Sequence, residues 1–116
     1  MTDEHLDLDA LSALREVMED EYPKLLDTFL TDSEERLGLL RKAQQGAQLI
    51  EEAHSFKGSS LNMGAVRLAE LCGQLEKSAN SLSSLDISEL IAKIDGEFAF
   101  VRPLYQAERQ RSLAEN

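Results

Sequence analysis

A histidine, a lysine and a glycine lie within about one turn of a helix predicted over residues 49–64. Lys57 and Gly58 follow His54 by three and four positions, and residues with these spacings are neighbours on a helix surface. At about 100° per residue, a mostly apolar stripe falls on another face of the helix. The stripe consists of Leu49, Ala53, Phe56, Ser60 and Met63. We therefore expect the His54 imidazole to point into solvent, beside a cation and a position without a side chain.

An imidazole in this setting could accept a phosphoryl group from another protein. The ordinary pKa of histidine is about 6.5, so an exposed ring is mostly neutral and nucleophilic near pH 7. Phosphoryl transfer develops charge on three equatorial oxygens, which Lys57 is placed to offset. Gly58 costs about 0.5–1 kcal/mol relative to alanine inside a helix, and its missing side chain would let a partner approach. Two large apolar residues on the same face, Ile50 and Leu61, would surround the docking point.

A surface histidine with a lysine one turn away is common and does not by itself indicate chemistry. The glycine and the two apolar neighbours favour the functional interpretation of His54. The other histidine, His5, lies in an acidic N-terminal segment and is interpreted as an ordinary surface residue. The single cysteine, Cys72, lies within an apolar stripe and is predicted to be a core residue. Because these N and S donors are not spaced as a pair, no metal site is expected.

The composition argues against several classes of partner and location. The chain has 22 acidic and 12 basic residues, a net charge of −10, which would repel nucleic acid and anionic membranes. One cysteine without a partner fits a reducing cytoplasm. No apolar run has the length of a membrane span, and the acidic N-terminus lacks signal-peptide character. A cytoplasmic protein that binds neither nucleic acid nor membrane is expected.

The helical periodicity predicts an all-α chain. A short helix capped by Asp7 or Asp9 is expected to end near residues 19–21, followed by a long helix from Pro23 to a Gly46 cap. Gly64 should close the histidine helix 49–64 or bend the chain into the next helix, whose stripe runs from Leu68 to Leu82. The last helix should begin at an Asp86–Glu89 capping box and kink or end at Pro103. Short loops make neighbouring helices antiparallel, so we predict an up-down four-helix bundle with a short additional N-terminal helix. Residues 1–116 are expected to be one domain, with residues 1–6 and 107–116 flexible.

Three segments resemble the histidine-containing phosphotransfer (HPt) domain of bacterial phosphorelays. They are AHSFKGSS at 53–60, the pair Gly64-Ala65, and LAELCGQLE at 68–76. The family pattern is roughly A-H-x-L-K-G-x-S/A, a Gly-Ala pair, and then Leu-x-x-Leu-Cys-x-x-Leu-Glu. Phe56 stands where leucine is usual, and since it lies on the core face it should alter packing and not chemistry. The order and length of the expected helices also agree with this family.

The resemblance implies a stand-alone phosphate carrier. His54 would accept a phosphoryl group from the aspartyl phosphate of a receiver domain, typically of a hybrid sensor kinase, and pass it to the aspartate of a response regulator. Lys57 would stabilise the phosphoryl group, and Gly58 would give the receiver clearance. Any Mg²⁺ would belong to the receiver, so the chain itself should need no cofactor. Transfer would be stoichiometric, so the chain would be a carrier and no turnover enzyme, and we expect a monomer.

Five further residues are expected around the docking point: Ile50, Glu51, Ser59, Leu61 and Arg67. Either Glu51 or Ser59 could orient the histidine ring, and the sequence leaves that choice open. Arg67 and Lys57 are the cations expected closest to the docking face, where local charge matters more than the acidic total.

Two other functions remain to be separated from phosphate transfer. The main alternative is a helical-bundle adaptor that binds a partner through the His54 face without covalent chemistry, and phosphate uptake distinguishes the two. A phosphocarrier of the sugar-uptake type is disfavoured, because those proteins contain strands and no period-2 segment is visible here.

Overall fold

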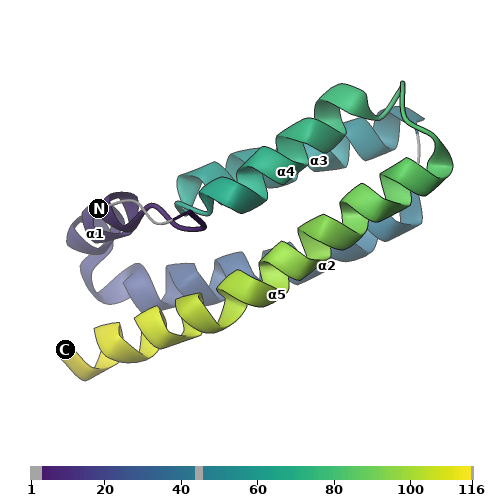
Figure 1. The fold of residues 1–116 in the computed structure, drawn as a ribbon. Helices are drawn as coiled ribbons and strands as arrows, with labels where there is room; N and C mark the ends of the chain where they lie inside the picture. The colour runs from purple at the N-terminus through teal and green to yellow at the C-terminus, as the bar shows by residue number, and fades with distance from the viewer. Residues whose placement is uncertain (1–3, 44–45, 116) are drawn as a thin grey trace.

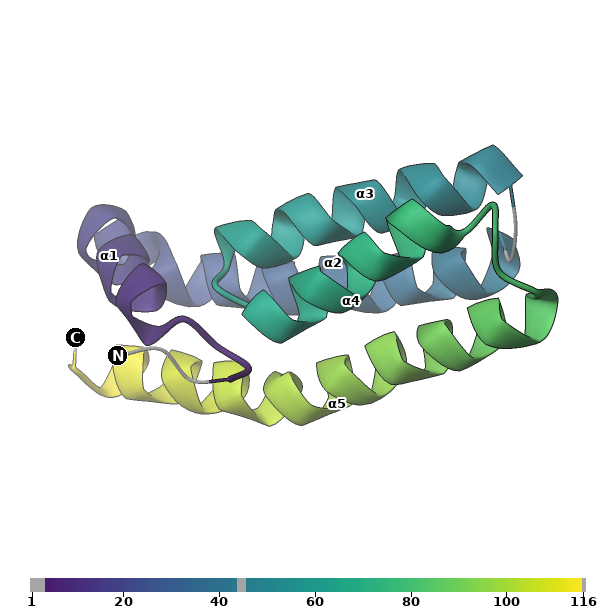
Figure 2. The ribbon, with the colours of Figure 1, turned by 45° about the horizontal axis from the view of Figure 1, so that its top comes forward.

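The chain folds as an antiparallel four-helix bundle with a short helix beyond one end (Figure 1). The computed structural model describes residues 4–43 and 46–115. Its elements are α1 (Leu8–Met18), a 3₁₀ turn η1 (Glu19–Glu21), α2 (Tyr22–Ala43), α3 (Gly46–Asn62), α4 (Val66–Ser78) and α5 (Ser84–Glu115). The predicted fold class is confirmed, and α3 and α4 form one antiparallel pair packed against α2 and α5 (Figure 2). No helix in the described part of the chain could cross a bilayer.

The core is formed by the apolar stripes that the helical period predicts. Phe56 of α3, Leu26 of α2 and Leu75 of α4 are fully buried. Tyr105 of α5 is also buried, and its hydroxyl donates a hydrogen bond to the Met63 carbonyl oxygen at 2.6 Å. This bond ties α5 to the turn that follows α3. The side of α3 opposite His54 is thereby fixed in the core.

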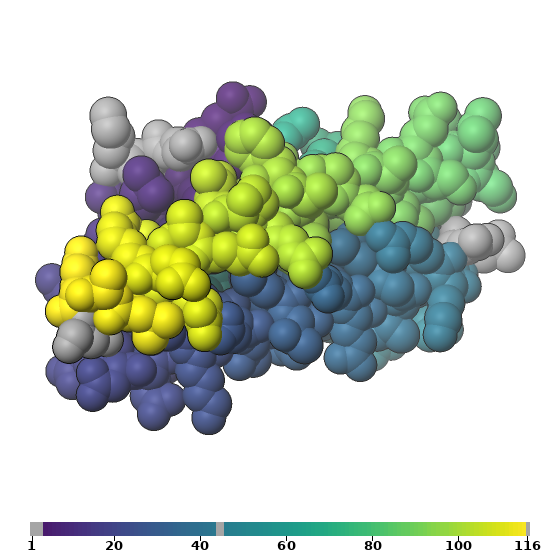
Figure 3. Space-filling view, turned by 90° about the horizontal axis from the view of Figure 1, so that it is seen from below, coloured from purple at the N-terminus to yellow at the C-terminus, as the bar shows by residue number. Residues whose placement is uncertain are grey.

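Three ion pairs join α2 to α5 along one side of the bundle. The pairs are Asp27–Arg109, Glu34–Arg102 and Arg41–Asp95. Each step moves seven residues forward on α2 and seven back on α5, which is the spacing of two helical turns on antiparallel neighbours. Figure 3 shows α2 and α5 side by side along this surface. The ladder of charges therefore follows the antiparallel register of the two helices.

The N-terminal segment contacts the bundle, which differs from the flexible segment expected over residues 1–6. Leu6 is buried in the core, and the Asp7 backbone N–H donates a 2.7 Å hydrogen bond to the Gly64 carbonyl oxygen. His5 is half-buried, and its Nδ1 lies 2.8 Å from Glu97 Oε2. His5 is therefore not an ordinary surface residue, whereas residues 1–3 lie outside the described part of the chain. Asp7 also caps α1 by accepting from the Ala10 N–H, as predicted.

Gly64 is required by the turn between α3 and α4. Its φ of +71° lies in the left-handed region, which favours glycine. A Cβ at this position would also lie 2.9 Å from the Asp7 backbone oxygen. The predicted role of Gly64 in closing the histidine helix is confirmed. Gly46 likewise has a positive φ of +82° and is the first residue of α3, while α2 ends at Ala43. The expected cap between these two helices falls on a stretch that includes residues 44–45, which lie outside the described part of the chain.

The last helix begins earlier than predicted and does not end at Pro103, where the sequence predicts a kink or an end. It begins at Ser84, and the Asp86 N–H donates to the Ser83 hydroxyl at 3.1 Å. The Asp86–Glu89 capping box is therefore wrong, because the preceding serine already caps the helix. At the other end, α5 continues through Pro103 to Glu115. Beyond the proline, Tyr105 and Ser112 are buried in the bundle, and this packing favours continuation of the helix in spite of the lost backbone hydrogen bond.

Candidate functional site

His54 projects outward from the middle of α3. Its side chain is 67% exposed, whereas the adjacent Ala53 and nearby Phe56 are fully buried. This outward placement follows from the helical period, because the apolar stripe of α3 fixes which face packs on α4 and α2. The predicted exposure of the imidazole is therefore confirmed.

Glu76 of α4 joins His54 and Lys57 into one network. Its Oε2 lies 2.6 Å from His54 Nδ1, and its Oε1 lies 2.8 Å from Lys57 Nζ. The Glu76 side chain is 23% exposed and the Lys57 side chain is 34% exposed. A single carboxylate on the neighbouring helix thus contacts both side chains of α3.

The network determines which nitrogen of the His54 ring is free to react. The hydrogen bond from Lys57 holds the pKa of the Glu76 carboxyl below its ordinary value, and the hydrogen bond from His54 acts in the same direction against the opposing effect of partial burial. Glu76 is therefore a charged, acceptor-only group near neutral pH. An acceptor at 2.6 Å requires the proton to be on Nδ1. In the neutral ring, Nε2 then carries the lone pair and can act as a nucleophile or hydrogen-bond acceptor.

The sequence prediction missed Glu76 as the orienting residue. Among the residues that the structure describes, the hydrogen bond to the ring comes from Glu76 and not from Glu51 or Ser59. A signal was present in the sequence, because residues equally distant from the turn of a helical hairpin meet. The pair of His54 with Glu76 is centred on Ala65, at the turn between α3 and α4.

Gly58 leaves open space beside the histidine. A Cβ at this position would meet no atom within 4 Å, so no contact with the described chain requires glycine there. Its helical position also needs no unusual backbone conformation, since α3 continues to Asn62. The predicted bare position next to His54 is present.

A groove of about 810 Å³ runs between α3 and α4 beside the network. Ile50, Leu61, Val66 and Ala69 form much of its apolar lining, and Lys57, Glu70 and Lys77 are among its polar residues. Leu61 is 55% exposed, as the sequence predicted. The expectation that Ile50 is exposed is wrong, because Ile50 is half-buried and packs against the core.

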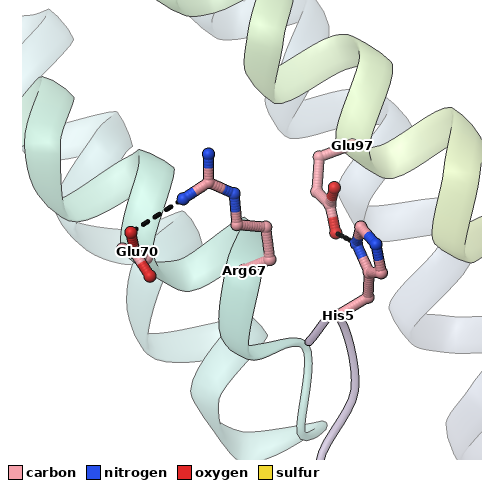
Figure 4. A network of polar contacts seen from close by, with 4 residues as sticks. All are labelled: His5, Arg67, Glu70 and Glu97. Carbon is pink, nitrogen blue, oxygen red and sulfur yellow. Dashed lines mark hydrogen bonds and ion pairs between the residues drawn. The ribbon is translucent and has the colours of Figure 1, made fainter. Parts of the chain in front are cut away.

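The other predicted docking residues differ in how close they come to the network. Glu51 is exposed and Ser59 half-buried on α3. Arg67 lies on α4, and its Nη1 is 2.7 Å from Glu70 Oε1 (Figure 4). The Arg67 charge is therefore paired at the edge of the groove and does not join the carboxylate that holds His54. In the same view, His5 meets Glu97 of α5 on the other side of Arg67.

Two other features considered in the sequence are the cysteine and the possible metal ligands. Cys72 is fully buried, and burial raises the pKa of its thiol to about 12, so it is a core residue as predicted. Within residues 4–43 and 46–115, no group of three or more His, Cys, Asp or Glu side chains could hold a metal ion.

Comparisons with known proteins agree on one family. The Hpt domain family matches residues 24–102. The phosphorelay protein LuxU of Vibrio harveyi is 35% identical over 92 residues, which cover 73% of this chain and 79% of that protein. The crystal structure of histidine-containing phosphotransfer protein B from Pseudomonas aeruginosa has a TM-score of 0.88 and 51% identity, over 95% of this chain and 98% of the other. A putative histidine-containing phosphotransfer protein from rice shares the fold, with a TM-score of 0.84 and 16% identity over 96% and 84% of the two chains.

Proposed function

Because the chain belongs to the Hpt domain family and is a phosphotransfer intermediate of phosphorelays, we propose that His54 is the residue that carries the phosphoryl group. The observation that supports this most directly is the exposed ring, held through Nδ1 by Glu76 with Lys57 on the same carboxylate. The other histidine, His5, is half-buried, and its Nδ1 lies 2.8 Å from Glu97 of α5.

The proposed donor is the aspartyl phosphate of a receiver domain, such as that of a hybrid sensor kinase. The lone pair of His54 Nε2 attacks phosphorus, the N–P bond forms, and the bond from phosphorus to the aspartate oxygen breaks. The aspartate leaves as a carboxylate. Nδ1 keeps its proton, so the phosphorylated ring gains positive charge, which the Glu76 carboxylate at 2.6 Å stabilises. The reverse sequence delivers the phosphoryl group to the aspartate of a response regulator.

During this reaction the ammonium group of Lys57 would turn from Glu76 toward the phosphoryl group. In the resting site its ammonium group is held 2.8 Å from Glu76 Oε1. An arriving phosphoryl group brings negative charge to the same place, and Lys57 can turn toward it without leaving the network. The lysine would then stabilise the charge that spreads over the equatorial oxygens.

The docking surface would surround His54 on α3 and extend into the groove toward α4. Gly58 provides clearance, while Leu61 and the half-buried Ile50 supply apolar contact. Glu51 and Ser59 would lie at the rim of this contact. We further propose that the chain works in the cytoplasm as a monomeric, stoichiometric carrier without a cofactor, and that any Mg²⁺ is bound by the receiver.

The test is uptake of phosphate from a phosphorylated receiver domain. The wild-type chain should gain an acid-labile phosphate, and His54→Gln should gain none while remaining folded and helical. His5→Gln serves as the matched control and should still be labelled. Label that persists on His54→Gln would place the phosphate elsewhere and refute the assignment. Binding of the receiver without label on any variant would favour the adaptor function.

A further inference from the structure

The side chain of Lys57 lies against a glycine of the neighbouring helix. Gly73 is within α4, and a Cβ placed there would lie 3.3 Å from Lys57 Cδ. That distance is shorter than an ordinary van der Waals contact, so with a methyl group at this position the lysine side chain would have to shift by a few tenths of an ångström. The aliphatic part of Lys57 therefore uses the space that the missing side chain of Gly73 leaves, while its ammonium group reaches Glu76 at 2.8 Å.

Gly73 differs in this respect from the other glycines inside the described helices. A Cβ at Gly38, Gly58 or Gly96 would meet nothing within 4 Å. Gly73 needs no unusual backbone conformation either, because the glycines with positive φ are Gly46 and Gly64. A glycine in a helix interior is unfavourable relative to alanine. The contact with Lys57 is thus a specific reason for a glycine at this position.

The antiparallel pairing of α3 with α4 places Gly73 next to Lys57 and Glu76 next to His54. Lys57 with Gly73 and His54 with Glu76 are both centred on Ala65, at the turn between the helices. One turn of α4 therefore presents a bare position to the lysine and a carboxylate to the histidine. The two positions differ by three residues, as do Lys57 and His54, so both contacts repeat the same step along antiparallel helices.

We propose that Gly73 is a positioning residue for phosphoryl transfer. It lets Lys57 lie close against α4, and this holds the ammonium group on Glu76 beside the His54 ring. A larger residue at Gly73 lifts the lysine away from α4 and from the place where the phosphoryl group arrives. This inference depends on the proposed function for its effect on transfer, whereas its effect on the Lys57–Glu76 contact is independent of it.

The first measurement is the rate of transfer from a phosphorylated receiver to Gly73→Ala. Gly96→Ala, on an exposed part of α5, is the control for a helical glycine-to-alanine change. We expect Gly73→Ala to transfer about three- to tenfold more slowly than Gly96→Ala, since a misplacement of about 1 Å can cost about 100-fold and one methyl group requires a smaller shift. Receiver binding should change less than the transfer rate. A rate equal to that of the control would overturn the proposal.

The second measurement separates positioning of Lys57 from any general effect of the alanine. In a Lys57→Ala background there is no lysine to displace, so adding Gly73→Ala should change the rate less than twofold. A loss as large as in the wild-type background would contradict the proposed role.

The third measurement needs no phosphate. The hydrogen bond from Lys57 is the main cause of the lowered Glu76 pKa, so Gly73→Ala should raise that pKa toward its ordinary value in a titration followed by NMR. An unchanged titration would refute the positioning role even if the chain accepts no phosphate. Absence of label on wild type and Gly96→Ala, together with a raised Glu76 pKa in Gly73→Ala, would refute the proposed function and retain this inference.

Discussion

Replacing Glu76 with glutamine should slow phosphoryl uptake by about 10–100-fold, by analogy with the effect of removing carboxylates that orient metal-binding histidine rings. The carboxylate accepts from two donors, His54 Nδ1 at 2.6 Å and Lys57 Nζ at 2.8 Å. The two donors contact different oxygens of the carboxylate, and an amide keeps an oxygen at only one of these two positions. If that oxygen faces Lys57, the amide N–H₂ faces Nδ1 and favours the tautomer with the proton on Nε2. If it faces His54, the N–H₂ group opposes the ammonium group and Lys57 loses its partner.

The assay is the initial rate of phosphate transfer from a labelled receiver, measured beside the nitrogen chemical shifts of the imidazole. Glu76→Gln should show the lower rate and a changed tautomer balance or a displaced Lys57. Glu89→Gln, an exposed acidic residue on α5, is the matched control and should behave as wild type. A Glu76→Gln rate within twofold of this control, with unchanged imidazole shifts, would show that the carboxylate does not select the nucleophile.

The stability difference between wild type and Glu76→Gln should depend on pH. The folded chain holds the Glu76 pKa below its ordinary value of 4.5, so this group contributes stability that is present above the unfolded value. That contribution is lost as the pH falls through the lowered pKa. Wild type should therefore be more stable than Glu76→Gln at pH 7, and the difference should shrink in acid. Urea unfolding at both pH values measures it, and a difference that grew in acid would reverse the assigned sign.

Three further changes test other parts of the site and fold. Lys57→Ala should reduce the transfer rate more than it weakens receiver binding, and equal losses would make Lys57 a docking contact only. Gly58→Gln should change the free energy of unfolding by about 0.5 kcal/mol or less, because the position is exposed, and so shift the thermal unfolding temperature by only a few degrees. The same change should block receiver binding. Normal transfer by this variant would refute the clearance argument. Reversing Glu34 to arginine should destabilise the bundle by about 1 kcal/mol or less by placing it opposite Arg102, and adding Arg102→Glu should restore the loss. Failure of the double change to restore stability would mean that the ion pair does not support the α2–α5 register.

The sequence predicted what a single helix determines. The period of α3 alone is enough to place His54 outward, Phe56 inward and Gly58 beside the ring, because side-chain directions repeat every 3.6 residues. The same reasoning correctly placed Cys72 in the core. It misjudged Ile50, since the neighbouring helix α4 covers part of a residue that the isolated helix would expose.

The ends of the chain were harder to predict because tertiary contacts override local signals there. Pro103 is a strong local signal for a helix end, but Tyr105 and Ser112 beyond it are buried in the bundle. The acidic N-terminal segment likewise gave no sign that Leu6 is buried or that Asp7 reaches the turn at Gly64. In both cases the deciding partner is distant in sequence.

Sequence reasoning missed Glu76 because the residue lies on α4, whereas the side chains it contacts lie on α3. His54 and Lys57 share a face of α3, but neither fixes the other, because the carboxylate that binds both lies on α4. The turn at Gly64 sets which residues of α4 stand opposite them. It does so through a backbone conformation and an Asp7 contact that exclude a side chain at Gly64. Which nitrogen of the His54 ring keeps its lone pair therefore depends on the geometry of a turn that lies outside the site itself.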